Sequence, residues 1–220
     1  MKSKLIVALD VDSYDQATRL VEELKEVVEV FKVGSQLFTR VGPKIVDFIN
    51  RQERRCFLDL KFHDIPNTVA KAVESAAALR VLMLTLHTAG GEEMLGAAAS
   101  ATGPGGPVLI GVTVLTSVAG NVESEVLARA TLAKSCGLAG VVASPREIKP
   151  LRQTFGNEFL IITPGIRPAW AEAGDQKRVM TPAEASAAGA DFIVVGRPII
   201  AAEQPAAALK VLTEMASAFS

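Results

Sequence analysis

Eight short runs of apolar and β-branched residues recur along this chain of 220 residues, and turn residues bound each of them. The runs are continuously hydrophobic rather than alternating, which is typical of strands buried on both faces of a parallel sheet. They lie at Leu5–Leu9, Val30–Val33, Cys56–Leu60, Val81–Leu86, Val108–Val114, Gly140–Ala143, Phe159–Ile162 and Phe192–Val195. Helical stretches separate them, so the pattern predicts eight strand–helix units and an α/β fold, a single (β/α)8 TIM barrel. An open doubly wound sheet is the structural alternative.

Helix start signals support this division of the chain. Ser13–Gln16 has the pattern of a capping box, in which the first and fourth residues satisfy each other's backbone N–H groups. Ser144–Glu147 and Thr181–Glu184 repeat the pattern with proline at the first helical position. Gly189 stands where a helix C-terminal cap is expected. No linker or repeat interrupts the pattern, so we expect one catalytic barrel domain over residues 1–220.

Composition excludes several classes of partner. The chain has 23 Lys and Arg against 24 Asp and Glu, so no net field attracts nucleic acid or a membrane surface. Cys56 and Cys136 lie far apart without zinc spacing, which indicates reduced thiols in a cytoplasmic protein. The stretch 94–122 carries no charge, but Gly103–Pro107 divides it, and the N-terminus offers no signal peptide. We therefore expect a soluble cytoplasmic protein.

Charged residues interrupt the third apolar run in an unusual way. Asp59 and Lys61 are two positions apart in a strand, so both side chains project from one face. The surrounding residues are apolar, and a buried charge is costly unless it is paired. Asp64 follows in the turn before a helix that begins at Pro66. A purely structural ion pair is the alternative to a catalytic site here.

Lys32 is a second cation within a second apolar strand. Two lysines beside two aspartates form an alternating array, in which the carboxylates keep both ammonium groups protonated. A protonated lysine cannot form an imine, and carboxylates already neutralised by lysine are poor metal ligands. The array therefore argues against an imine-forming lysine and against a metal site.

Basic residues follow the seventh and eighth strands, where barrels of this kind commonly bind phosphate. Gly196 permits close backbone approach, and Arg197 can hold phosphate oxygens bidentately. The connection 166–180 adds Arg167 and Gln176 and is long enough to act as a closing lid. A solvated loop is the alternative for this segment. Polar residues at other strand ends include Asp10 and Thr116.

The combination of these motifs resembles a known family. Asp59-x-Lys61-x-x-Asp64 followed by Ile65–Thr68 is similar to the signature of the bacterial orotidine 5′-phosphate decarboxylases. The resemblance extends over nearly the whole chain. It includes Ala8–Asp10, Phe31–Gly34, His87–Gly91, Leu115–Ser117, Thr163–Arg167, Gly174–Gln176 and Val195–Pro198.

The resemblance implies a role for each matching residue. It implies a cofactor-free homodimer that converts orotidine 5′-phosphate to UMP, the last step of de novo pyrimidine nucleotide synthesis. Lys61 would protonate the carbanion at C6, and Asp59, Lys32 and Asp64 would complete a charged tetrad. Asp64 and Thr68 would reach the active site of the partner subunit. The implied substrate-binding residues are Asp10 and Lys32 for the ribose, Thr116 for the pyrimidine, and Gln176, Gly196, Arg197 and Arg167 for the phosphate.

Two other functions stay open at this point. A magnesium-dependent enzyme acting on keto-sugar phosphates could use the same barrel, but it needs a carboxylate near the second strand end, where this chain has Lys32. A non-catalytic nucleotide-binding barrel could keep Gln176 and Arg197, but it has no use for four alternating charges.

Overall fold

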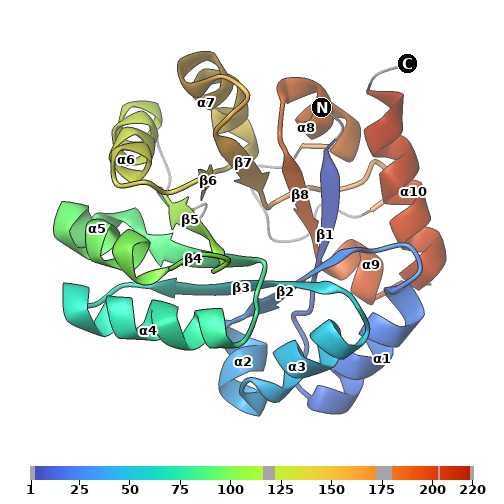
Figure 1. Ribbon diagram of the computed structural model, residues 1–220. Coiled ribbons are helices and arrows are strands. Elements are labelled where there is room, and N and C mark those ends of the chain that lie inside the picture. The colour runs from blue at the N-terminus through green and yellow to red at the C-terminus, as the bar shows by residue number, and fades with distance from the viewer. Residues whose placement is uncertain (1–2, 116–121, 172–179, 203, 219–220) are drawn as a thin grey trace.

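A computed structural model describes residues 3–115, 122–171, 180–202 and 204–218. Eight parallel strands form a closed barrel in chain order, and the blue β1 lies beside β8 where the barrel closes (Figure 1). The strands are β1 (Lys4–Ala8), β2 (Val30–Gly34), β3 (Arg55–Phe62), β4 (Met83–His87), β5 (Val108–Val112), β6 (Gly140–Val142), β7 (Leu160–Thr163) and β8 (Phe192–Val195). This confirms the predicted (β/α)8 barrel and rules out the open sheet.

Helices surround the strands on the outside (Figure 1). They are α1 (Tyr14–Leu24), α2 (Ser35–Val41), α3 (Lys44–Arg51), α4 (Pro66–Ala78), α5 (Gly91–Ala101), α6 (Glu123–Ser135), α7 (Ile148–Phe155), α8 (Pro182–Ala188), α9 (Arg197–Ile200) and α10 (Gln204–Ser217). Two single-turn 3₁₀ helices, η1 (Thr88–Gly90) and η2 (Pro145–Glu147), precede α5 and α7. None of the helices within the described ranges is long and apolar enough to cross a membrane.

The predicted capping signals are present to different degrees. Thr181 and Glu184 form the full reciprocal box at the start of α8, and Gly189 ends that helix with a φ of 103°. Ser13 accepts from the backbone N–H of Gln16, but the Gln16 side chain bonds the N–H of Asp12 instead of returning to Ser13. The prediction for the start of α1 was therefore right for one of the two hydrogen bonds of a capping box. At Ser144 the turn that follows is 3₁₀ rather than α-helical.

The predicted strands all exist, but most of their ends differ from the prediction by one or two residues. The third strand runs to Phe62 instead of Leu60. The fourth begins at Met83 instead of Val81. The fifth ends at Val112, two residues before the predicted Val114. Just past the end of the strand, the backbone carbonyl of Thr113 accepts from the Arg129 side chain on α6 at 2.7 Å. Hydrophobicity alone does not reveal that contact.

Two apolar layers fill the molecule. The larger one lies between the strands and the helices. The smaller one fills the barrel interior, where side chains from alternating positions meet: Ile6, Ala8, Val30, Phe57, Met83, Ile110, Ile162 and Val194. Two positions further along β2, β3 and β4, the inward residues are Lys32, Asp59 and Thr85. Because every second residue of a strand faces inward, the apolar layer is followed by a polar layer at the C-terminal end of the barrel.

The pairing of β3 with β4 is irregular at this polar level. Leu58 pairs with Leu84, and the next pair is Phe62 with Leu86, so β3 advances four residues while β4 advances two. Such a bulge removes residues from the regular ladder and redirects their side chains. The bulge contains Asp59 and Lys61.

Candidate active site

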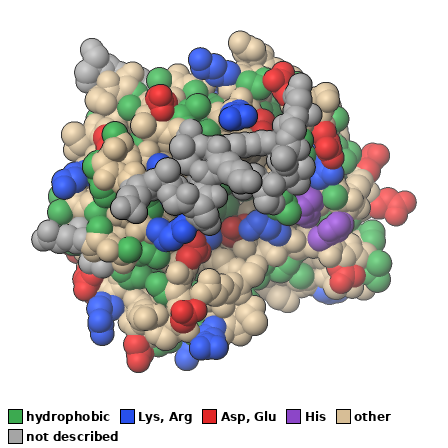
Figure 2. Space-filling view, turned by 180° about the vertical axis from the view of Figure 1, so that it is seen from behind, with side chains coloured by type: hydrophobic (Ala, Val, Ile, Leu, Met, Phe, Trp, Pro, Cys, Tyr) green, Lys and Arg blue, Asp and Glu red, His purple; other side chains and the backbone are tan. Residues whose placement is uncertain are grey.

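A pocket of about 270 Å³ opens at the C-terminal ends of the strands. Its described walls come from β1, β2, β3, β5, β6, β7, β8 and the turns that follow some of these strands. In Figure 2, basic and acidic side chains form a row beside the grey atoms on one face, and the row ends near the two histidines. Active sites of (β/α)8 barrels lie at this end of the barrel.

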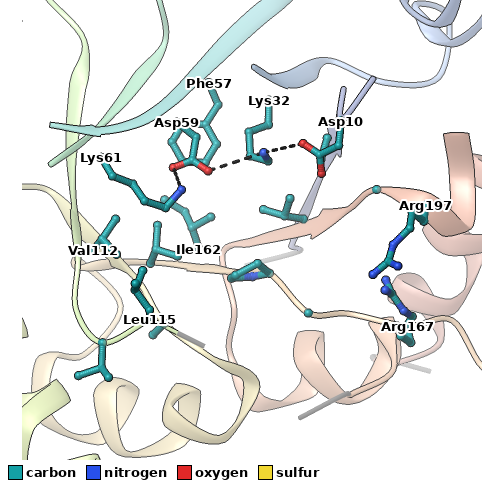
Figure 3. Close-up of a pocket in the computed structure, with 18 residues that line it drawn as sticks. Asp10, Lys32, Phe57, Asp59, Lys61, Val112, Leu115, Ile162, Arg167 and Arg197 are labelled. Carbon is teal, nitrogen blue, oxygen red and sulfur yellow. Dashed lines mark hydrogen bonds and ion pairs between the residues drawn. The ribbon is translucent and has the colours of Figure 1, made fainter. Parts of the chain in front are cut away.

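Four charged side chains form a continuous row in the pocket (Figure 3). Lys32 Nζ lies 3.2 Å from Oδ1 of Asp10 and 3.6 Å from Oδ2 of Asp59. Lys61 Nζ lies 2.8 Å from the other carboxylate oxygen of Asp59, Oδ1. The signs alternate along the row, so each charge lies next to one of opposite sign. Lys32 and Asp59 form the inner pair, because Lys32 contacts both aspartates and Asp59 contacts both lysines.

Burial differs along this row. The side chains of Lys32 and Asp59 are each 13% exposed, whereas that of Lys61 is 37% exposed. Gly34 helps to admit the Lys32 ammonium group, since a Cβ at that position would lie 3.0 Å from Nζ. The inner pair therefore forms a fixed support, and the Lys61 ammonium group is more open to a molecule in the pocket.

The backbone at Lys61 has a left-handed conformation, with a φ of 53°. A non-glycine residue in this region costs on the order of 1 kcal/mol or more, and such residues concentrate at functional sites. Here the conformation lies within the β3 bulge.

Apolar side chains form the rest of the wall beside the lysine. Phe57, Val112, Leu115 and Ile162 line the pocket and are labelled in Figure 3. An apolar wall lowers the local dielectric, so a fixed ammonium group acts more strongly on charge that develops nearby.

Two arginines lie at the opposite side of the pocket. Arg167 and Arg197 both line it, and their guanidinium groups point toward one another in Figure 3. Two guanidinium groups in this arrangement suit a phosphate, which accepts hydrogen bonds from several sides. Gly196 also lines the pocket, and a Cβ there would lie 3.5 Å from Oδ2 of Asp10, an ordinary contact. A Cβ at this position would therefore not clash with the rest of the protein, and the glycine leaves that space open to the pocket.

Asp64 and Thr68 do not line this pocket and are exposed. Oδ1 of Asp64 accepts from the backbone N–H of Ile65 at 2.6 Å, in the turn that leads into α4. Ile65 is 66% exposed, unusually high for a large apolar side chain. The fold of one subunit therefore brings Asp10, Lys32, Asp59 and Lys61 together, and leaves Asp64 and Thr68 on the surface.

Thr116 and Gln176 lie outside the described residues, as do Ser117, Gly174 and Asp175 of the resemblance. The two ends of the segment that contains Gln176 are described. Arg167 donates its backbone N–H to the carbonyl of Met180 at 3.0 Å, next to an isolated parallel bridge between Ile166 and Met180. This bridge joins the start and the end of the predicted lid segment.

The two histidines stack on one another near the lysine. The rings of His63 and His87 lie 5.3 Å apart with an interplanar angle of 22°. Burial lowers the pKa of His87, and the charges of His63, Arg129 and Lys61 lower it further. Nδ1 of His87 accepts from the backbone N–H of Ala89 at 3.2 Å. The ring is thus held as the N-terminal cap of η1, in keeping with a structural residue.

Sequence reasoning missed several residues of this site. The apolar wall could have been found by counting two positions along each strand, since Phe57 precedes Asp59 and Val112 follows Ile110 in this way. The same counting from Met83 leads to Thr85, whose hydroxyl donates to Oδ1 of Asp59 at 3.0 Å. Leu115, 43% exposed at the end of a described segment, lies outside this even spacing and was found only as part of the motif Leu115–Ser117.

Burial raises the pKa of the Cys56 thiol well above its usual range, so this residue stays a neutral core side chain. Within the described parts of the chain, no three His, Cys, Asp or Glu side chains are grouped so that they could hold a metal ion.

Comparison with known proteins gives a consistent result. The chain matches the family model described as Orotidine 5'-phosphate decarboxylase / HUMPS family over residues 3–212. An orotidine 5'-phosphate decarboxylase from Syntrophotalea carbinolica is 51% identical over an alignment of 237 residues, gaps included. The alignment covers 99% of this chain and 96% of that protein. One from Moorella thermoacetica is 48% identical over 229 residues, covering 96% and 91%. The crystal structure of orotidine 5'-phosphate decarboxylase from Lactobacillus acidophilus has a TM-score of 0.84 and 35% identity, covering 97% of this chain and 99% of its own. This chain therefore belongs to the orotidine 5′-phosphate decarboxylase / HUMPS family.

Proposed function

We propose that this protein decarboxylates orotidine 5′-phosphate to UMP, the last step of de novo pyrimidine nucleotide synthesis. The observation that carries the proposal is the row Asp10–Lys32–Asp59–Lys61 beside an apolar wall, with two arginines across the pocket. The relatives named for this reaction at 51% and 48% identity add support.

The chemistry requires a cation at C6 of the orotate ring. The bond from C6 to its carboxylate breaks, carbon dioxide leaves, and the electron pair stays on C6. An ammonium group fixed beside C6 stabilises this charge and then transfers its proton to C6. We assign that role to Lys61, which is left neutral and regains a proton from solvent. The uncatalysed reaction is slow, and enzymes lower such barriers by up to about 20 kcal/mol.

The other charged residues would position Lys61 and the ribose. Asp59 accepts from Lys61 and contacts Lys32, so it can fix the direction of the catalytic ammonium group. Asp10 is 50% exposed at the pocket and, with Lys32, would bind ribose hydroxyl groups.

The two ends of the substrate would be held separately. Thr116 would bind the pyrimidine, and Gln176, Gly196 and Arg197, with Arg167 nearby, would bind the phosphate. Binding energy from a group remote from C6 can be used to close a lid and to stabilise the transition state.

Two residues would serve the site of a second subunit. Asp64 and Thr68 are exposed outside this subunit's pocket, and the neighbouring Ile65 is an apolar side chain open to an interface. We propose a homodimer in which Asp64 joins the partner's Lys32, Asp59 and Lys61 as the fourth member of a charged tetrad.

The same row supports a reaction without a metal ion. The Asp59 carboxylate already contacts two ammonium groups, which makes it a poor ligand for a divalent cation. Both cysteines are free thiols, as is usual in a reducing compartment, and we propose a cytoplasmic enzyme.

The first test is the loss of orotate absorbance when purified protein is mixed with orotidine 5′-phosphate, with and without EDTA. We expect rapid loss that EDTA does not change, matched by UMP formation. Absence of turnover by a folded protein that binds UMP would overturn the proposal and favour a nucleotide-binding barrel. Turnover of keto-sugar phosphates only with magnesium would favour the rival enzyme class.

A further inference from the structure

Thr85 is the inward-facing residue of β4 at the level of the charged row. It follows Met83, a member of the apolar layer inside the barrel, by two positions. Its side chain is fully buried, and it is not among the described residues that line the pocket. A buried hydroxyl group needs hydrogen-bond partners, so its contacts indicate what it does.

The hydroxyl group of Thr85 contacts both Lys61, which we place at the reacting carbon, and Asp59, which would position Lys61. Oγ1 accepts from the backbone N–H of Lys61 at 2.9 Å and donates to Oδ1 of Asp59 at 3.0 Å. A hydroxyl group has one proton, so its proton is directed to the carboxylate while a lone pair takes the N–H. The same Oδ1 atom accepts from Nζ of Lys61 at 2.8 Å.

The bulge in β3 explains why this contact matters. Between Leu58 and Phe62 the regular ladder with β4 is interrupted. An N–H that leaves a ladder inside a protein needs another acceptor. Thr85 supplies that acceptor at Lys61, the residue with the left-handed backbone.

We propose that Thr85 is a positioning residue for the decarboxylation. Its hydroxyl group fixes the Asp59 carboxylate and the Lys61 backbone together, so that the Lys61 ammonium group is held where C6 of the substrate will lie. The catalytic part of this inference rests on the proposed function. Thr85 itself does not line the pocket, so it would not contact the substrate.

Two substitutions separate the hydroxyl group from the shape of the side chain. Thr85→Val keeps the branched shape but leaves the Lys61 N–H without its acceptor and removes one donor from the Asp59 carboxylate. Thr85→Ser keeps the hydroxyl group and removes a methyl group. If the hydroxyl group positions the pair, serine restores what valine loses.

Thr88 provides a matched control. It is also buried, at 1% exposed, and its hydroxyl group donates to the backbone carbonyl of Val112 at 2.8 Å. Its methyl group faces the helix layer, since a Cβ on Gly111 would meet Cγ2 of Thr88 at 2.8 Å. Thr88→Val therefore makes the same chemical change nearby without touching Asp59 or Lys61.

The experiment measures kcat, KM for orotidine 5′-phosphate and Kd for UMP in the wild type and these three variants. For Thr85→Val we expect kcat to fall about 10- to 100-fold, with KM and Kd within about threefold of the wild type. Thr85→Ser and Thr88→Val should keep kcat within about threefold. An unchanged kcat in Thr85→Val, or an equal loss in Thr85→Ser or Thr88→Val, would overturn the inference.

Crystal structures of the wild type and Thr85→Val give a readout that does not depend on activity. We expect the variant to lose the 2.8 Å contact between Lys61 Nζ and Asp59 Oδ1 or the positive φ at Lys61. If the wild type does not decarboxylate orotidine 5′-phosphate, the proposed function fails, and this comparison still decides the positioning role. An unchanged geometry in Thr85→Val would contradict it.

Discussion

Nζ of Lys61 lies 2.8 Å from Oδ1 of Asp59, although the two residues are successive members of one face of one strand. In a regular strand, residues two apart have Cα atoms about 6.6 Å from one another, and their side chains run roughly parallel. The left-handed backbone at Lys61 and the bulge in β3 accompany the close approach. The contact therefore depends on the local backbone as much as on the two charges.

Replacing Lys61 tests its proposed role as the proton donor. We expect Lys61→Ala to lower kcat at least about 1000-fold, because both the proton and the stabilising charge are lost. Circular dichroism and UMP binding should show a folded protein. Substantial turnover by a folded variant would contradict the assignment.

Mixing two inactive variants tests the shared site. We expect Lys61→Ala and Asp64→Asn to be inactive alone, and a mixture to regain up to about a quarter of wild-type activity after random subunit exchange. In each hybrid dimer, one site contains both substitutions and the other contains neither. The measurement is the rate after refolding the mixed subunits. No recovery, despite hybrid dimers detected by mass spectrometry, would exclude donation of Asp64.

Arg197→Ala tests the phosphate side of the pocket. We expect the affinity for UMP to fall about 10- to 100-fold, since charge-assisted hydrogen bonds to phosphate are lost. The affinity for uridine, which has no phosphate, should not change. Arg19→Ala, on the exposed surface of α1, is the matched control. Equal losses for UMP and uridine would place Arg197 in a different role.

The parts of this site that follow from strand alternation could be predicted from the sequence. Lys32, Asp59 and Lys61 each follow an interior residue at even spacing, and all three line the pocket. The bulge could not be predicted in this way. It changes the register of β3 on β4, and a change of register depends on contacts between residues far apart in sequence.

The opposite end of the barrel offers a test of stability. Arg152 on α7 bonds the Asp191 carboxylate at 2.6 Å and the carbonyl of Gly189, and both charged side chains are at most 15% exposed. Removing one partner of a largely buried pair leaves an uncompensated charge. We expect Arg152→Met to lower the free energy of unfolding by about 3 kcal/mol in urea titration, with kcat unchanged.

The matched control for this substitution is the exposed pair of Lys71 and Glu74, whose side chains are 67% and 49% exposed. We expect Lys71→Met to change stability by less than about 0.5 kcal/mol. Similar effects of the two substitutions would show that burial does not govern the strength of the Arg152 contact.

His87 predicts a pH dependence of stability. Its pKa is lowered from the ordinary value of 6.5, mainly by burial, so the folded protein binds this proton less tightly than the unfolded chain does. Its contribution is constant above that value, and the free energy of unfolding falls as the pH drops from there toward the folded pKa. His87→Asn keeps an acceptor for the Ala89 N–H and removes the titration.

The measurement is urea unfolding at about pH 7.5 and about pH 5.5, at fixed protein concentration. We expect a smaller loss of stability at the lower pH in His87→Asn than in the wild type. An identical loss in both proteins would mean that other groups determine the acid response.

Predictions from the sequence were weakest where a residue acts away from its own strand. Asp64 and Thr68 are recognisable only through a family motif, because nothing in the fold of one subunit brings them to the pocket. The end of β5 was predicted two residues too late, at a point where the carbonyl of Thr113 accepts from the Arg129 side chain. Hydrophobic periodicity records neither a side-chain contact of this kind nor the second subunit that the proposed role of Asp64 and Thr68 requires.

The apolar layer inside the barrel, from Ile6 to Val194, separates the two ends of the molecule chemically. The charged row lies on one side of it, and the Arg152–Asp191 pair lies at the start of β8 on the other. Substitutions that change the reaction can therefore accumulate at the C-terminal end of the barrel, while substitutions that restore stability accumulate at the N-terminal end. A chain built in this way can change its chemistry without first giving up its fold.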